Sequence, residues 1–132
     1  MNFLRSALAA AALLSAAPAV AADGVRLPEG FIDVAPLVVP VLDDYRMSGR
    51  LRVHFTVQSD DSAVKERFSA AKPKMVDIYV RRLTEFARLW VDPSRPVDMP
   101  RLAKALNEAT EEFTPKSGAK VYILEAVVER QR

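Results

Sequence analysis

The chain has 132 residues, a formal net charge of +2 and no cysteine. This length suits a single domain with one modest core, and the absence of cysteine excludes disulfides as a source of stability. Cations are interspersed with acids and do not gather beside aromatic residues, a distribution that argues against a nucleic-acid-binding protein.

The first residues have the composition of a secretory signal peptide. A short start with one cation, Arg5, precedes an alanine-rich apolar run over residues 7–17, and Ala19-Val20-Ala21 resembles a cleavage site. The alternative is a membrane anchor, which needs about 20 apolar residues. We expect residues 1–22 to be removed on export, which takes away one cation and leaves a net charge of +1. The protein is then periplasmic, or anchored in the inner membrane if the segment is retained.

Residues 23–33 are expected to form a leader segment before a single α+β domain over residues 34–132. Val34–Leu42 has strand composition, but its two prolines cannot donate to a ladder, so an edge or irregular strand is expected. Residues 43–49 are polar and end in glycine, which predicts a hairpin loop. Arg50–Ser59 follows as the clearest strand, because apolar and polar residues alternate along it.

Two helices carry the predicted apolar faces of the helical layer. The N-cap candidates of a short helix over residues 63–71 are Ser59-Asp60-Asp61-Ser62. Pro73 opens the main helix, which ends before a pair of prolines. Asp98 caps the next helix. The predicted inner residues are Val76, Tyr79, Leu83, Phe86 and Trp90 in the main helix, and Leu102, Leu106, Ala109 and Phe113 in the next.

The final strand, Ala119–Val128, is apolar on both faces, with Val121, Ile123 and Val127 expected on one side. This pattern predicts a strand in the middle of the sheet. The expected order is strand, strand, helix, helix, strand. A small antiparallel sheet of about three strands would then have two to three helices packed on one face.

Candidate catalytic and metal-binding residues are few. His54 is the single histidine and has no cysteine or second histidine to act with, so we interpret it as a solvated or sheet-covered side chain. Asp43-Asp44 and Asp60-Asp61 are carboxylate pairs, but they lie where turns and N-caps favour aspartate. No serine has a nucleophile motif, and the four glycines form no phosphate-binding loop. We therefore expect no catalytic residue, no cofactor and no metal site.

Arg81, Arg82, Arg88, Arg95 and Arg101 form a loosely basic stretch around the helix pair, which would suit an anionic partner or the lipid headgroups of a nearby membrane. Arg81, Arg88 and Arg95 are the candidate residues of a partner-binding surface, and the alternative is an ordinary solvated face. Phe86 and Trp90 could form an interaction patch, but their helical spacing favours the core.

Several features occur in a particular order over residues 31–131. They are the proline-marked strand Pro36–Leu42, the alternating strand Leu51–Gln58 with Ser59-Asp60-Asp61, the proline-started helix at Lys72–Asp77, and the strand Val121–Val128 with Glu129-Arg130-Gln131. In this order the chain resembles the periplasmic domain of the FliL family of flagellar basal-body-associated proteins. Members of that family are expected to have a transmembrane helix before the domain, where this chain has a signal-like segment.

The resemblance implies a non-enzymatic, self-associating domain with a stomatin-like fold that forms rings around the stator of the flagellar motor. Its partners would be other copies of itself and membrane-embedded motor subunits, without nucleic acid. One alternative is a periplasmic module of the same fold with no motility role. Another is a small hydrolase or ligand-binding protein, for which the necessary polar constellation is absent from the sequence.

Overall fold

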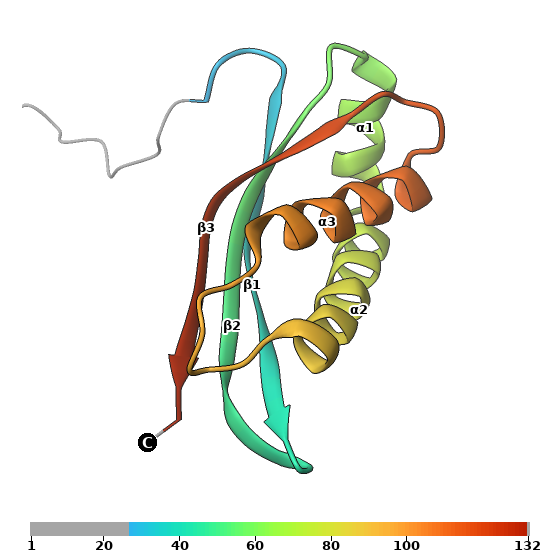
Figure 1. Cartoon of the computed structure of the whole chain (residues 1–132). Helices are drawn as coiled ribbons and strands as arrows, with labels where there is room; N and C mark the ends of the chain where they lie inside the picture. The colour runs from blue at the N-terminus through green and yellow to red at the C-terminus, as the bar shows by residue number, and fades with distance from the viewer. Residues whose placement is uncertain (1–26, 132) are drawn as a thin grey trace, which may run out of the picture.

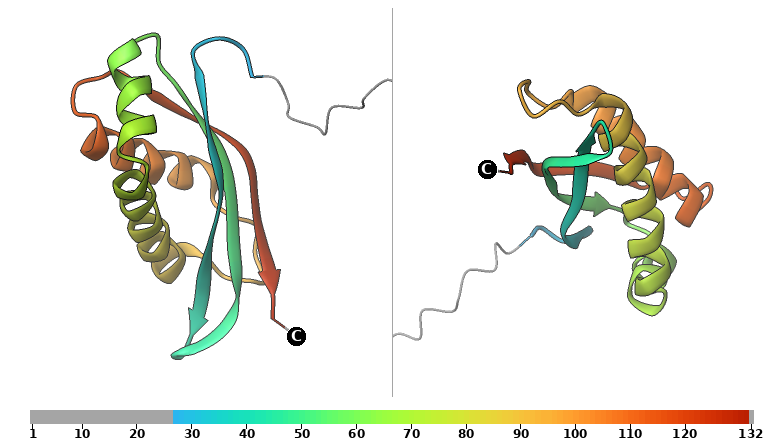
Figure 2. Two further views of the ribbon diagram at one scale, coloured as in Figure 1. Left: turned by 180° about the vertical axis from the view of Figure 1, so that it is seen from behind. Right: turned by 90° about the horizontal axis from the view of Figure 1, so that it is seen from below.

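The computed structural model describes residues 27–131, and the predicted signal peptide lies outside them. The fold is α+β, with a three-stranded antiparallel sheet and three helices. The elements are β1 (Phe31–Asp43), β2 (Arg46–Gln58), α1 (Ser62–Ala70), α2 (Lys72–Trp90), α3 (Met99–Phe113) and β3 (Lys120–Arg130). All three helices lie on one side of the sheet, and the other face is open (Figures 1 and 2). Among these residues, no helix is long and apolar enough to cross a bilayer.

The β1–β2 hairpin is tighter and longer than the sequence predicts. Its loop is reduced to Asp44 and Tyr45, and β2 already begins at Arg46. Gly49, expected at the end of the loop, instead lies within β2 and is paired with Arg130 of β3. A Cβ atom at this glycine would collide with the carbonyl oxygen of Glu129, so the glycine allows two strands to approach closely.

The strand order is β1-β2-β3, so β2 is central and the prediction that the last strand lies in the middle of the sheet is wrong. The apolar residues on the outer face of β3 are exposed, so they do not indicate that this strand is covered on both faces. A register shift opposite His54 and Phe55 also interrupts its alternation. Beyond the shift, Ala126 and Val128 pack against the core, and Val127, predicted to share a side with the buried Val121, is 39 % exposed.

The core lies between the sheet and the helices. The four inner residues of β2, the inner residues of α3 and the central residues of α2 are buried, as predicted. They are Leu51, Val53, Phe55 and Val57 in β2, Leu102, Leu106, Ala109 and Phe113 in α3, and Tyr79, Leu83 and Phe86 in α2. One polar chain crosses this core, because Tyr79 Oη lies 2.6 Å from Thr110 Oγ1, which donates to the carbonyl oxygen of Leu106 (2.9 Å). Burial raises the pKa of Tyr79 to about 12.

The helix starts follow the sequence prediction. The carboxylate of Asp61 accepts a hydrogen bond from the Ala63 amide (2.9 Å), and that of Asp98 accepts one from the Arg101 amide (3.1 Å). Pro73 lies in the first turn of α2, where the missing N–H is tolerated. Asp61, Pro73 and Asp98 therefore mark where α1, α2 and α3 begin.

Both edges of the sheet carry features that interrupt strand pairing. On β1, Pro36 and Pro40 have no N–H to offer, and the register shifts between Val34 and Leu37. On β3, the Val121 amide donates to the side-chain oxygen of Asn107 in α3 (3.0 Å).

Candidate interaction surface

His54 lies on the open face of the sheet, in the middle of β2. Its Nε2 atom is 2.7 Å from Oδ1 of Asp33 in β1, and Glu125 of β3 is its partner in the register. The side chain of His54 is 26 % exposed, which agrees with the interpretation of a partly covered histidine. Within residues 27–131, no group of three or more histidine, aspartate or glutamate residues could hold a metal ion.

The two carboxylate pairs are separated by the length of the sheet. Asp44 forms half of the hairpin turn, at the end where β1 and β2 are farthest from α1. Asp61 is the N-cap of α1 at the opposite end, beside Asp60. The structure therefore gives Asp44 and Asp61 local backbone roles and does not bring the two pairs together.

The three arginines predicted to bind a partner do not converge on one site. Arg81 pairs with Asp77 in the same helix (3.1 Å), and Arg95 in the α2–α3 loop lies 3.7 Å from Asp92. Arg88 has no carboxylate within 4.0 Å among the described residues. Hydrogen bonds from Ser94 lower the pKa of Asp92, and the nearby charge of Arg95 contributes less.

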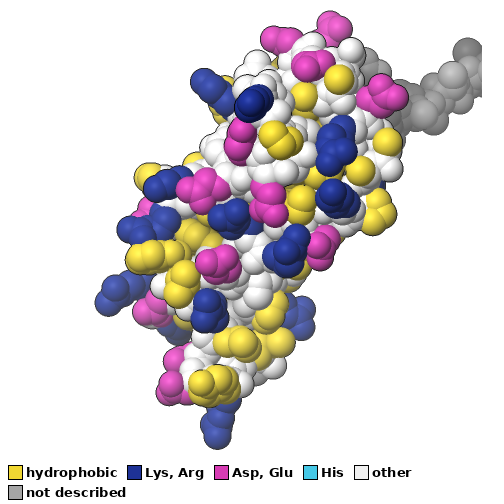
Figure 3. Space-filling model, turned by 90° about the vertical axis from the view of Figure 1, so that its right-hand side faces the viewer, with side chains coloured by type: hydrophobic (Ala, Val, Ile, Leu, Met, Phe, Trp, Pro, Cys, Tyr) yellow, Lys and Arg dark blue, Asp and Glu magenta, His cyan; other side chains and the backbone are white. Residues whose placement is uncertain are grey.

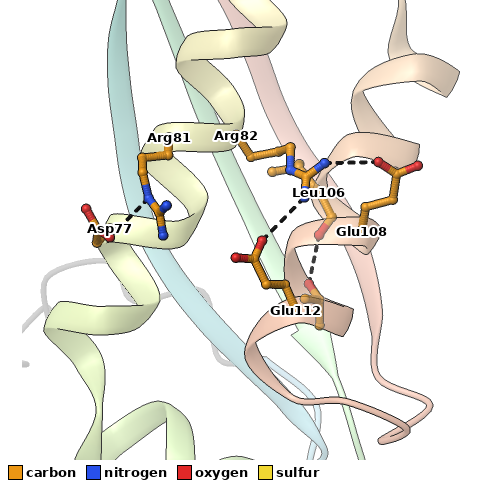
Figure 4. Close-up of polar contacts among 7 residues, drawn as sticks. Asp77, Arg81, Arg82, Leu106, Glu108 and Glu112 are labelled. Carbon is orange, nitrogen blue, oxygen red and sulfur yellow. Dashed lines mark hydrogen bonds and ion pairs between the residues drawn. The ribbon is translucent and has the colours of Figure 1, made fainter.

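Arg82, which the sequence placed in the basic stretch but not among the candidate partner-binding residues, has the more specific role. Its two terminal nitrogens reach Glu108 (3.2 Å) and Glu112 (3.3 Å), one turn apart on α3 (Figure 4). A guanidinium that bridges two carboxylates fixes the distance between helices better than a single surface ion pair does. This contact forms one wall of a groove between α2 and α3. Figure 3 shows the helical side of the molecule, where acidic and basic side chains are interspersed.

The groove has a volume of about 230 Å³ and an apolar floor. Phe86 is buried there, but Leu89 and Trp90 are 53 % and 51 % exposed. The prediction that Trp90 belongs to the core is therefore wrong. Trp90 is the last residue of α2, and it is covered on one side by the Arg101 guanidinium, which lies 3.5 Å from the ring centroid.

The charges around the groove are only partly neutralised by its own residues. Arg101 is held by Asp98 at 3.4 Å. Lys104 and Glu85 also line the groove, and neither has an opposite charge within 4.0 Å among the described residues. An exposed tryptophan with a stacked arginine is a combination enriched at the energetic centre of protein interfaces.

A second exposed apolar group lies at the tip of the β1–β2 hairpin. Leu42 and Met47 face each other across the strands and are 50 % and 46 % exposed. Tyr45, between them, is fully exposed (101 %). Sequence reasoning treated this segment as a polar loop, although the apolar residues around Asp43-Asp44 gave a signal that could have identified it.

Searches of family models, of curated proteins and of solved structures each find no match to this chain. We therefore infer function from these surfaces and from the resemblance to the FliL family.

Proposed function

We propose that this protein is a non-enzymatic periplasmic domain of the FliL type. It supports the flagellar basal body and motor, or a related envelope complex, through protein–protein contacts that include contacts with its own copies. The flagellar role follows from the resemblance in the order of elements, and contact as the mode of action is supported by the surface.

The observation that carries the contact role is the groove at Trp90. Trp90 and Leu89 expose apolar surface beside the buried Phe86, and Arg101 is held over the indole ring. Aromatic residues and arginine at a partly desolvated site give large binding energy for a small area. Pockets for drug-sized ligands usually occupy about 300–1,000 Å³. The volume of about 230 Å³ thus fits a protruding protein side chain better than such a ligand.

A capture experiment in the native envelope tests this role. The full chain, tagged at its C-terminus and crosslinked in living cells, should recover membrane-embedded motor subunits, and Leu89→Ala with Trp90→Ala should lose most of that recovery. The matched control is Val38→Ala with Leu124→Ala, which removes apolar surface of similar exposure from the open face of the sheet. Equal recovery by both double variants would contradict a contact role for the groove.

Motility separates the flagellar role from the alternative module. Deletion of the gene should reduce swimming in soft agar, and the wild-type protein should restore it. Normal swimming in the deletion strain, with recovered partners from another envelope complex, would contradict the flagellar role and leave the contact role in place.

A further inference from the structure

The hairpin tip holds a tyrosine in a conformation that this residue rarely adopts. Asp44 and Tyr45 have φ angles of 45° and 64°. Two-residue hairpin loops of this kind favour asparagine and glycine because both positions need positive φ. Tyr45 is 101 % exposed, so no contact with the rest of residues 27–131 offsets this cost. Strained residues of this kind occur preferentially at functional sites.

The tip has a distinct chemistry in addition to its shape. Tyr45 is preceded by Asp43 and Asp44, and neither carboxylate has a cation within 4.0 Å among residues 27–131. Leu42 and Met47 form an apolar base beneath the turn. The tip is therefore an exposed aromatic side chain with two acids before it and one cation, Arg46, after it, on a narrow projection.

The groove between α2 and α3 has the complementary chemistry. Its floor is apolar at Leu89 and Trp90, and Arg101 and Lys104 supply positive charge on the α3 side. A tyrosine can stack on the indole ring or on the guanidinium, and aspartates beside it can pair with the two cations. Glu85 lies on the opposite wall and would remain outside these pairs.

The tip and the groove of one molecule do not meet. The hairpin extends well beyond the C-terminal end of α2 in the views of Figures 1 and 2, and the exposure of Tyr45 excludes a contact with its own groove. We propose that Tyr45 of one copy inserts into the groove at Trp90 of a second copy, with Asp43 and Asp44 facing Arg101 and Lys104. This contact rests on the role in protein contact proposed above and specifies the second copy as one occupant of the groove.

The mode of association follows from the use of two different surfaces. A contact between a tip and a groove is heterologous, so each bound copy still has one free tip or one free groove. Association then continues until a ring closes or an open chain forms. The hairpin tip, residues 42–47, buries less area than a standard interface, so the affinity of a single contact is expected to be weak.

Sedimentation velocity of the exported protein, from about 1 µM to about 1 mM, measures this association. The wild-type protein should show species larger than a dimer as concentration rises. Tyr45→Gly and Trp90→Ala should each weaken the contact by about 30-fold or more, as expected for residues at an energetic centre. Tyr45→Gly is chosen because glycine relieves the strained turn, so any loss of association cannot come from an unfolded hairpin.

The decisive experiment mixes these two variants. Tyr45→Gly retains an intact groove and Trp90→Ala retains an intact tip, so the mixture should form a one-to-one complex and nothing larger. Asp44→Lys should also weaken association, and the double variant Asp44→Lys with Lys104→Glu should regain species larger than a dimer, because the reversed charges then pair in every contact.

Three results would overturn the proposal: a monomeric wild type up to 1 mM, undiminished association of Tyr45→Gly, or a mixture that stays monomeric. A monomeric wild type combined with Trp90-dependent capture of envelope proteins would reject the tip-in-groove contact alone. Association of the wild type without any captured envelope partner would reject the proposed function alone.

Discussion

The two faces of the sheet differ although the same three strands form both. On the face toward the helices, Leu51, Val53 and Phe55 of β2 are completely buried. On the open face, Arg50, Arg52 and His54 alternate with them, and the flanking strands expose Val38 and Leu124. The helices, and not the strands themselves, therefore determine which apolar residues stabilise the fold. Apolar residues on the open face have no covering layer and contribute little to folding.

The largest expected effect on stability comes from comparing a leucine on the buried face of the sheet with a leucine on the open face. Leu51→Ala removes a side chain with 0 % exposure and should lower the free energy of unfolding by about 2–5 kcal/mol. Leu124→Ala removes a side chain that is 52 % exposed and should lower it by less than about 1 kcal/mol. Urea unfolding followed by circular dichroism measures both, and similar losses would contradict the difference between the faces.

A second test uses the polar chain that crosses the buried face. The pKa of Tyr79 is raised to about 12 in the folded state, against about 10 in the unfolded chain, so the folded state holds its proton more tightly. The stabilisation is complete below about pH 10 and is lost as pH rises towards 12, by about 2–3 kcal/mol.

Tyr79→Phe removes this titration together with the hydrogen bond to Thr110. The variant should be less stable by about 1 kcal/mol at neutral pH, and its stability should fall less steeply between pH 10 and 12. Parallel slopes for wild type and Tyr79→Phe would show that burial does not hold this proton.

The smallest expected effect concerns the open face. His54→Ala removes an exposed pair with Asp33 and should change the free energy of unfolding by no more than about 0.5 kcal/mol, because exposed ion pairs contribute little. Swimming or partner capture should stay nearly intact. A folded His54→Ala protein that has lost function would point to chemistry on the open face and would contradict the proposal of a non-enzymatic domain.

The fold class and most of the element order could be predicted because the signals are local. Alternation along β2, the N-caps Asp61 and Asp98, and Pro73 in the first turn of α2 each depend on a few neighbouring residues. The position of β3 at the edge depends on pairing between distant segments, which composition does not report. The shift opposite His54 and Phe55 likewise places one more residue in β3 than strict alternation expects.

The candidate site was predicted less well than the fold. Helical spacing placed Trp90 in the core because it continues the row of Leu83 and Phe86, but spacing does not show where the covering layer ends. The bridge from Arg82 to Glu108 and Glu112 joins two helices, so no single-helix pattern announces it. Arg81, in contrast, was singled out by sequence and is paired within its own helix.

The features that interrupt strand pairing at the two sheet edges also affect solubility. A long unprotected edge strand recruits strands from other molecules and leads to aggregation or fibres. Here the prolines of β1 deny hydrogen bonds to an incoming strand, and Asn107 occupies an amide at the start of β3. Further along, Arg130 donates to the Pro93 carbonyl oxygen of the α2–α3 loop (3.3 Å), which ties that loop to the end of the strand. A chain that accumulates at high local concentration can therefore meet its neighbours through side chains without its sheet growing into them.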